Sequence, residues 1–241
     1  AAAAALVPEA IAKRGTLTVA ADASYPPDEF MDNDGKTVIG MDVDLMNAIG
    51  DVLGLKVTVS NAAFDTIIPA LVSGKFDIGA SSFTDTKERE QQVDFVTYFS
   101  AGEGFYINAD SKNSFDGLDS LCGYKVAVEK GTVEETDATT QDTTCKAAGK
   151  PGVTVLSFGT QNEANLALSS GRADGSTSRP RRRCASSAAS TRRHRPWRPT
   201  GSPTCSRYSR CPWACPVSPS AVERKTAEMS LKPSTSAFCA K

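Results

Sequence analysis

A short loop of small hydroxyl residues lies between two apolar runs of the chain and is followed by a single arginine. The apolar runs are residues 76–79 and 93–99, the arginine is Arg89, and the hydroxyl residues are Ser81, Ser82 and Thr84. Small residues leave backbone N–H groups open to a ligand, and a guanidinium grips a carboxylate through two parallel hydrogen bonds. The segment therefore predicts a site for a small carboxylate. The alternative interpretation is a hydroxyl-rich turn beside a solvated arginine.

Alternating strands and helices must position this loop. Apolar residues recur about every 3.6 residues across 41–53 and 64–73, which predicts two amphipathic helices. Strands are predicted at 16–20, 55–60 and 76–79. Because the order is strand, helix, strand, helix, strand, the predicted fold class is α/β, with parallel strands and helices on both faces of the sheet.

Polar and aromatic residues follow the ends of these strands. Asp22 and Tyr25 come after the first strand, and Phe64 comes after the strand at 55–60. Open α/β sheets bind ligands at the carboxyl ends of their parallel strands, so we expect these side chains to meet the hydroxyl loop at one site. Two alternatives stay open: Asp22 as a turn-capping carboxylate, and Tyr25 and Phe64 as ordinary core residues.

Seven sequence blocks together resemble the family 3 extracellular solute-binding proteins, the amino-acid receptors of ABC importers. The blocks span 15–27, 40–45, 64–71, 74–77, 84–89, 126–132 and 171–174. The resemblance covers residues 11–174 and implies a type 2 periplasmic-binding-protein-like fold, with two α/β lobes joined by a hinge. On this basis we expect 1–10 to be a flexible N-terminal segment, 11–103 to begin the first lobe and 104–174 to begin the second.

The resemblance also implies a role for the candidate residues. Tyr25 and Phe64 would pack against the side chain of the ligand, and Arg89 would clamp its α-carboxylate. Thr132 would add an N–H and a hydroxyl at a helix start, where the helix dipole favours an anion. The full predicted ligand-binding set is Asp22, Tyr25, Phe64, Ser81, Ser82, Thr84, Arg89 and Thr132.

Recognition of the α-amino group is incomplete in this sequence. The Ser82 backbone and the Thr84 hydroxyl would contact the α-amino or α-carboxylate group. The family also supplies a second-lobe aspartate, a few residues after the block at 171–174, that binds the α-ammonium group. No acidic residue lies between Asp174 and Glu223, so that contact is missing here.

The implied function is non-catalytic capture of a polar amino acid for an ABC importer, with the two lobes closing by a hinge motion. The expected partners are the small amino acid and the membrane permease; we expect a monomer, and no catalytic residue, cofactor, metal or nucleic-acid partner. One alternative is a dehydratase-like enzyme on the same fold, which would need a poised acid or base in the pocket. Another is a nucleic-acid or membrane-binding protein that acts through a basic tail.

The resemblance implies export, with the protein periplasmic or tethered to the outer face of the cytoplasmic membrane. We expect that a targeting segment has already been removed ahead of Ala1. No apolar run approaches the roughly 18 residues that a membrane span needs. Before residue 174 the chain holds two cysteines, Cys122 and Cys145. An even number in an exported protein predicts one disulfide; the alternative is two unpaired buried thiols.

Residues 175–241 differ sharply in composition from the rest of the chain. They carry 14 Lys+Arg and 2 Asp+Glu, against 13 and 26 in residues 1–174, so the formal net charge of −1 hides two opposed parts. Such asymmetry suggests an arm that binds nucleic acid or an anionic membrane. The arginines at 181–183 and 192–195, with Trp197 nearby, are the candidates for that role.

A reading in the wrong frame explains this tail better. Excess Arg, Pro, Ser, Ala and Cys without periodic apolar runs is typical of a GC-rich coding sequence read out of frame, and the change falls where the family pattern expects another strand. We therefore hypothesise that 175–241 is an aberrant basic tail that replaces the rest of the second lobe and the return to the first. Cys211, Cys215 and the single histidine, His194, receive no metal or catalytic role.

Overall fold

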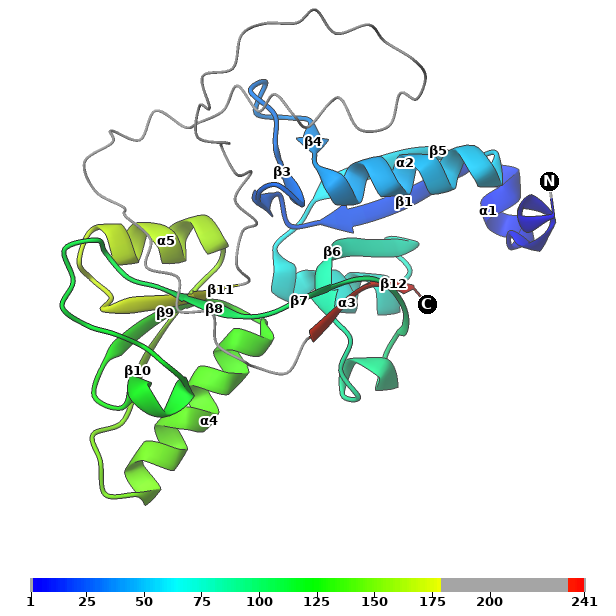
Figure 1. Cartoon of the computed structure of the whole chain (residues 1–241). Helices are drawn as coiled ribbons and strands as arrows, with labels where there is room; N and C mark the ends of the chain where they lie inside the picture. Colours follow the sequence, from blue (N-terminus) through cyan, green and yellow to red (C-terminus); the bar gives the residue numbers. More distant parts are fainter. Residues whose placement is uncertain (1, 179–233, 241) are drawn as a thin grey trace, which may run out of the picture.

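The computed structural model describes residues 2–178 and 234–240. These residues form two α/β lobes, each built around its own sheet (Figure 1). The chain passes from the first sheet to the second between Ala101 and Gly104. The arrangement of the two sheets decides which loops face one another.

The first lobe has a five-stranded sheet and two helices. Its strands are β1 (Thr16–Ala21), β5 (Lys56–Asn61), β6 (Ile78–Thr84), β7 (Asp94–Ala101) and β12 (Ser234–Ala240). Its helices are α2 (Met41–Leu53) and α3 (Phe64–Val72). The strand order is β5-β1-β6-β12-β7, and β1 runs parallel to both of its neighbours. The two helices and three parallel strands predicted from the sequence are confirmed. Strand β6 continues through Ser81, Ser82 and Thr84, which were expected to form a loop, because its last two residues pair with β12.

Helix α2 packs its apolar face on strand β1. Met46 is fully buried in a cluster with Leu17 and Val19, and burial of one such side chain stabilises the fold by about 1.5–3 kcal/mol. The helix ends because Gly54 adopts a φ of 71°, a left-handed conformation that favours glycine. The same packing fixes the first turn of α2, which carries the buried Asp42.

A small antiparallel sheet lies at the end of the first lobe. It consists of β2 (Ser24–Tyr25), β3 (Glu29–Met31) and β4 (Val38–Ile39), in that order. Its β2–β3 turn brings Glu29 into the interior, where the residue is only 1 % exposed. This position of Glu29 comes from the fold of the hairpin, because the sequence around it has no apolar periodicity that marks it as buried.

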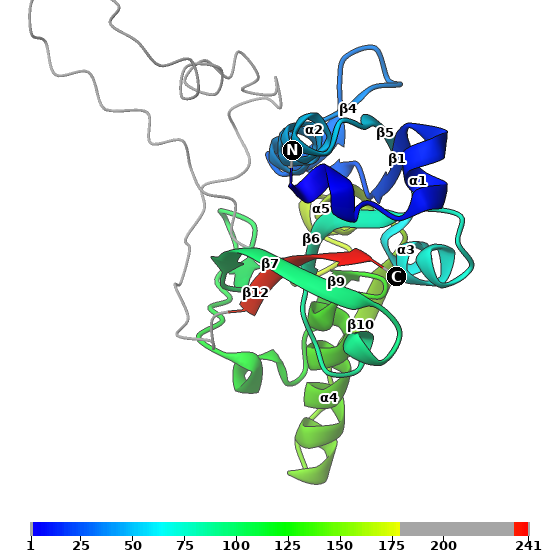
Figure 2. The ribbon, with the colours of Figure 1, turned by 90° about the vertical axis from the view of Figure 1, so that its right-hand side faces the viewer.

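The last described strand returns to the first lobe. Strand β12 pairs antiparallel with both β6 and β7 and lies between them (Figure 2). This corrects the expectation that residues 175–241 provide no return to the first lobe. A strand held on both sides gains backbone hydrogen bonds along both edges, so it needs no strong apolar alternation in its own sequence. Several residues discussed from the sequence lie outside the described residues: the basic clusters at 181–183 and 192–195, Trp197, His194, Cys211 and Cys215.

The second lobe has a four-stranded sheet. Its strands are β8 (Gly104–Tyr106), β9 (Lys125–Glu129), β10 (Thr154–Phe158) and β11 (Gly175–Ser178), in the order β10-β9-β11-β8. Its helical elements are η3 (Leu118–Leu121), α4 (Val133–Ala147) and α5 (Gln161–Ser169). Strand β9 is parallel to β10 and β11, whereas β11 and β8 are antiparallel. All four residues of β11 are buried, although three of them carry hydroxyl groups.

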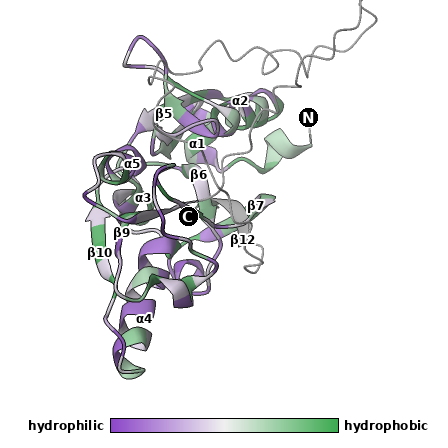
Figure 3. Ribbon diagram, turned by 60° about the vertical axis from the view of Figure 1, so that its left-hand side comes forward, coloured by the Kyte–Doolittle hydropathy of each residue, from purple (hydrophilic) through white to green (hydrophobic). Residues whose placement is uncertain are grey.

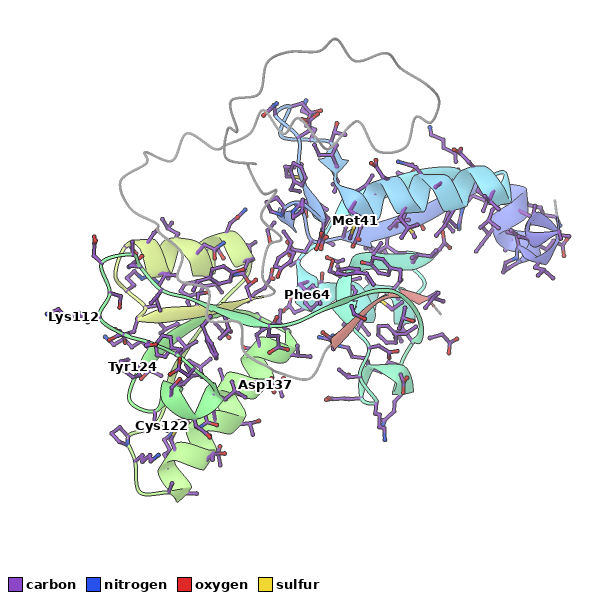
Figure 4. The ribbon with its side chains drawn as sticks, viewed as in Figure 1. Met41, Phe64, Lys112, Cys122, Tyr124 and Asp137 are labelled. Atoms are coloured by element: carbon purple, nitrogen blue, oxygen red, sulfur yellow. A yellow bond between two sulfur atoms is a disulfide. The ribbon has the colours of Figure 1, made fainter. Side chains whose placement is uncertain are left out.

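Helix α4 extends away from the first lobe and is polar over much of its surface (Figure 3). It is anchored by a disulfide between Cys122, just after η3, and Cys145 in its last turn, with the two Cα atoms 5.6 Å apart. Figure 4 places Cys122 on the second lobe, away from Phe64 where the lobes meet. The predicted pairing of the two cysteines is confirmed.

The N-terminal residues are more ordered than expected for a flexible segment. A 3-10 turn, η1 (Ala3–Leu6), is followed by helix α1 (Glu9–Arg14). Val7 and Ile11 pack against the first-lobe core, which explains why these residues adopt regular structure. No helix within residues 2–178 is long and apolar enough to cross a membrane, nor is there one in 234–240.

Candidate ligand-binding site

All eight residues predicted to bind a ligand line one cleft between the two lobes. The cleft encloses about 420 Å³ of empty space, its open mouth included. Its described lining residues are Asp22, Tyr25, Glu29, Phe64, Ser81, Ser82, Thr84, Arg89, Glu129, Thr132, Val133, Glu134, Gln161 and Ser178. The eight residues chosen from the sequence therefore lie close together in space. That they bind a ligand stays a prediction.

The hydroxyl residues Ser81 and Ser82 of β6 are held from behind by carboxylates. The Ser81 hydroxyl donates to Glu29 Oε1 at 2.8 Å and accepts the N–H of Asp22 at 2.9 Å. The N–H of Ser82 donates to Asp42 Oδ2 at 3.0 Å. Ser82 also has a φ of 47°, which is uncommon for a residue other than glycine. This N–H is therefore engaged by Asp42 within the first lobe.

Arg89 joins the two lobes at the cleft. It begins the short 3-10 element η2 (Arg89–Gln91). Its Nη1 donates to the Thr84 carbonyl at 2.8 Å and its Nη2 to the Gly131 carbonyl of the second lobe at 2.9 Å. The guanidinium also lies 5.6 Å from the ring centroids of both Phe64 and Phe83, a distance that allows a cation–π interaction.

Asp22 serves as a capping residue in this structure. Its Oδ1 accepts the N–H of Ser24 at 3.1 Å, and its Oδ2 accepts the N–H of Phe64, the first residue of α3, at 2.9 Å. Burial raises the pKa of Asp22 above its usual value, while these hydrogen bonds act in the opposite direction. Of the two interpretations made from the sequence, the turn-capping one is observed, and the carboxylate still borders the cleft.

Thr132 forms the N-terminal cap of α4. Its Oγ1 accepts the N–H of Glu135 at 3.2 Å and donates to the Glu129 carbonyl at 2.6 Å. Glu135 reaches back to accept the N–H of Gly131 at 2.7 Å. The hydroxyl of Thr132 is thus used in capping. What α4 offers to the cleft is its N-terminus, which carries partial positive charge.

Six of the described residues that line the cleft were not predicted from the sequence. Glu129 ends β9, and its Oε1 accepts the N–H of Gln161 at 3.1 Å and the Ser24 hydroxyl at 3.5 Å. Burial raises the pKa of Glu129 to about 8, and the charge of Asp22 acts in the same direction. The signal that could have found Glu129 is its place at the carboxyl end of a predicted parallel strand. The other missed lining residues are Glu29, Val133, Glu134, Gln161 and Ser178.

The lobes meet around the cleft through polar contacts. The Tyr25 hydroxyl and the Ser178 hydroxyl are 2.8 Å apart. At the rim, Lys130 Nζ of the second lobe lies 2.8 Å from Asp65 Oδ2 at the start of α3. These contacts and the Arg89 bridge show a closed arrangement, in which loops from both sheets contribute to one cavity.

Acidic groups outnumber basic ones in the cleft. Among its described lining residues, four are acidic, namely Asp22, Glu29, Glu129 and Glu134, and the basic one is Arg89. Burial favours the protonated form of Glu29 and Glu129 by raising the pKa of each. A ligand with cationic groups would complement this lining by favouring the ionised form of the carboxyl group that it meets. No group of three or more His, Cys, Asp or Glu able to hold a metal ion occurs within the described parts of the chain.

A family model of the bacterial extracellular solute-binding proteins, family 3, matches residues 17–228. The match continues beyond residue 174, although the sequence blocks that show the resemblance end at that residue. The Arginine-binding protein ArgT of Corynebacterium glutamicum is 42% identical over 171 residues, which cover 70% of this chain and 56% of that protein. The chain thus spans little more than half the length of this curated relative.

Two solved structures extend the comparison. Holo ArgBP from T. maritima superposes with a TM-score of 0.64 at 33% identity and covers 72% of this chain and 73% of its own. An ancestral amino acid-binding protein, described as a precursor of cyclohexadienyl dehydratase, gives a TM-score of 0.64 at 37% identity and covers 71% and 73% of the two chains. These neighbours confirm the expected two-lobe type 2 fold.

Proposed function

Because the chain belongs to the family 3 bacterial extracellular solute-binding proteins, we propose that it captures a free amino acid with a cationic side chain, of the L-arginine type, and delivers it to an ABC importer. Capture takes place between the two lobes and involves no chemical step. The names of its relatives support this proposal, since both the Corynebacterium and the T. maritima proteins are described as arginine-binding.

The observation that carries the proposal is the charge balance of the cleft. Arg89 and the N-terminus of α4 offer positive potential to one α-carboxylate. Glu129 and Glu134 offer negative charge to the cationic groups of the ligand. Since Glu129 is protonated at neutral pH in the empty cleft, its pKa being about 8, a nearby ligand cation would favour its ionised form.

The remaining lining residues fit the same ligand. Tyr25 and Phe64 provide flat walls for the aliphatic part of the side chain, and Phe64 is stacked on Phe83 with ring centroids 4.4 Å apart. The Ser82 carbonyl is an acceptor suited to the α-ammonium group, because its N–H is already held by Asp42. Ser178, at the end of β11, lies in the cleft near the position where the family pattern expects an aspartate.

A dehydratase is the second candidate function, and one observation favours it. Such an enzyme needs a proton-carrying acid in its pocket, and Glu129 meets this requirement. An ancestral neighbour is described as a precursor of cyclohexadienyl dehydratase, although it is itself an amino acid-binding protein. Consumption of a cyclohexadienyl substrate by the wild-type protein, abolished in Glu129→Gln, would establish this function.

Family membership supports a location outside the cytoplasm, and we infer a periplasmic protein or one tethered to the outer face of the membrane. The permease of the importer is the inferred partner, and the protein is inferred to act as a monomer. Cell fractionation with antibody detection tests the location, because recovery in the cytoplasmic fraction alone would contradict export.

Thermal unfolding with a panel of free amino acids tests the proposal. A ligand that binds only the folded protein raises the melting temperature, and at one ligand concentration it does so by more when it binds more tightly. We expect L-arginine and L-lysine to raise it and L-glutamate and L-leucine to leave it unchanged. Glu129→Gln serves as the comparison variant, since it keeps the shape of the side chain but should reduce the preference for cations. A panel in which no amino acid has an effect, or L-glutamate has the largest, would contradict the proposal.

A further inference from the structure

Two carboxyl groups lie buried directly behind the cleft wall of the first lobe. Glu29 on β3 is 1 % exposed, and Asp42 in the first turn of α2 is fully buried. Neither has a basic partner among the described residues. Buried carboxyl groups without a cation are costly unless they carry a proton or accept several hydrogen bonds, so their arrangement requires an explanation.

Glu29 acts on the cleft through Ser81. Its Oε1 accepts the Ser81 hydroxyl at 2.8 Å, and that hydroxyl in turn accepts the N–H of Asp22 at 2.9 Å. Its second oxygen, Oε2, is buried and accepts no hydrogen bond within the described residues, while the side chain of Glu29 is hydrogen-bonded to Asp42. Two carboxyl groups can form a hydrogen bond only when one of them carries a proton, because an ionised carboxylate has acceptors alone.

Asp42 acts on the cleft through Ser82. Its Oδ2 accepts the N–H of Ser82 at 3.0 Å, and both of its oxygens lie 2.8 Å from the hydroxyl of Tyr98 on β7. Tyr98 remains a donor because burial, reinforced by the charge of Asp42, raises its pKa. Asp42 therefore has the donors that an ionised carboxylate needs, and Glu29 lacks them.

Burial and the neighbouring acidic groups favour a single negative charge on the pair Glu29 and Asp42. Burial raises the pKa of Glu29 well above its usual value, and the charge of Asp42 adds to this effect. The other titratable groups that face Glu29 are Asp28 and Asp22, whose charges act in the same direction. For Asp42, burial raises the pKa to about 6, so it is ionised at neutral pH.

We propose that Glu29 is an uncharged positioning residue that orients Ser81 through Oε1, while ionised Asp42 orients Ser82, so that the pair sets the first-lobe wall of the cleft before a ligand arrives. The consequence for ligand affinity rests on the proposed function. The protonation state of Glu29 does not, and it is testable without any ligand.

The first experiment compares ligand-free Glu29→Gln with the wild type by thermal unfolding between roughly pH 5 and pH 8. A folded-state pKa above the unfolded value means that the folded protein holds an additional proton, so wild-type stability falls as the pH rises above the unfolded value. Glutamine needs no such proton. The melting temperature of Glu29→Gln relative to wild type should therefore increase with pH, whereas the exposed control Glu88→Gln should show no such trend.

The second experiment measures binding of L-arginine by calorimetry. Glu29→Gln retains an acceptor for Ser81 and should bind within about twofold of wild type, whereas Glu29→Ala releases Ser81 and should bind about tenfold more weakly. Equal losses in the two variants, with no pH trend in the first experiment, would show that Glu29 acts as a charge and would overturn the proposal. Absence of binding by the wild type would contradict the proposed function instead, and the pH trend would still decide the state of Glu29.

Discussion

The two lobes hold their cleft residues in different ways. In the first lobe, Ser81 and Ser82 of β6 are fixed from behind by Glu29 and Asp42 through direct hydrogen bonds. In the second lobe, strand β11 enters the same region with buried hydroxyl residues, and the Ser176 and Thr177 hydroxyls have no partner among the described residues. The hydroxyl residues of β6 are thus held by side chains of their own lobe, whereas two hydroxyls of β11 have no such support within the described residues.

From this difference we infer that the first lobe mainly recognises the ligand and that the second lobe mainly closes the cleft. Asp22, Ser81 and Ser82 are held whether or not a ligand is present, because their hydrogen-bond partners lie within the first lobe. Arg89 and Tyr25 instead contact the second lobe. The second lobe lines the cleft with Glu129, the N-terminus of α4 and Ser178, and its stability relies in part on the disulfide beyond the cleft. A substitution that weakens the second lobe should therefore reduce the free energy of unfolding more than it reduces the affinity for a ligand.

The largest effect is expected when the coding DNA after residue 174 is translated in another reading frame. If residues 175–241 are an out-of-frame reading, the other frame should restore an acidic residue shortly after Asp174 and apolar residues in place of the buried hydroxyls of β11. Protein made in that frame should be more stable and bind amino acids more tightly than the chain described here. Sequencing of the DNA, with intact mass and calorimetry of both proteins, checks this. Micromolar or tighter binding by the present chain would contradict the hypothesis.

Removal of the disulfide should destabilise the second lobe. The bridge closes a loop between residues separated by 23 positions, for which loop-closure entropy gives about 3 kcal/mol. We expect Cys122→Ala with Cys145→Ala to lose stability of this order in denaturant unfolding, with ligand affinity nearly unchanged because neither cysteine lines the cleft. A large loss of affinity with full stability would contradict the separation of closure from recognition.

The sequence predicts those site residues whose positions follow from the order of the strands. Asp22 and Phe64 follow the parallel strands β1 and β5, and Ser81–Thr84 end the neighbouring parallel strand β6, so their convergence follows from topology. Glu29 could not be found this way, because only the hairpin turn of β2 and β3 brings it into the interior. Strand β12 was missed because its place in the sheet depends on backbone pairing with β6 and β7 rather than on a pattern in its own residues.

A substitution on β11 should stabilise the second lobe. Thr177→Val keeps the shape of the side chain and removes a buried hydroxyl that has no partner among the described residues. An unsatisfied buried polar group costs about 1–3 kcal/mol, so we expect a gain of about 1–2 kcal/mol in denaturant unfolding. The exposed strand residue Thr58 provides the matched control, Thr58→Val, which should change stability by less than about 0.5 kcal/mol. Destabilisation by Thr177→Val would show that its hydroxyl has a partner.

The smallest effect concerns the pH dependence of binding. Glu129 has a pKa of about 8 in the empty cleft, and a bound cation should lower it, so binding releases a proton at neutral pH. Affinity for L-arginine should therefore rise with pH from roughly 6.5 to 8, by less than about tenfold per pH unit. Calorimetry in buffers of different ionisation enthalpy measures the released proton, and Glu129→Gln should abolish it. A flat affinity profile in the wild type would argue against a ligand cation near Glu129.

The central claim is that the cleft recognises a free α-carboxylate through Arg89 at the junction of the two lobes. The most direct test is calorimetry of L-arginine and L-arginine amide against the wild type and Arg89→Ala. A charge-assisted hydrogen bond is worth about 1.5–3 kcal/mol, so the wild type should bind the free acid roughly tenfold to a hundredfold more tightly than the amide. Arg89→Ala should bind the acid more weakly by a similar factor and lose this preference. Equal affinity of the wild type for acid and amide would contradict the account.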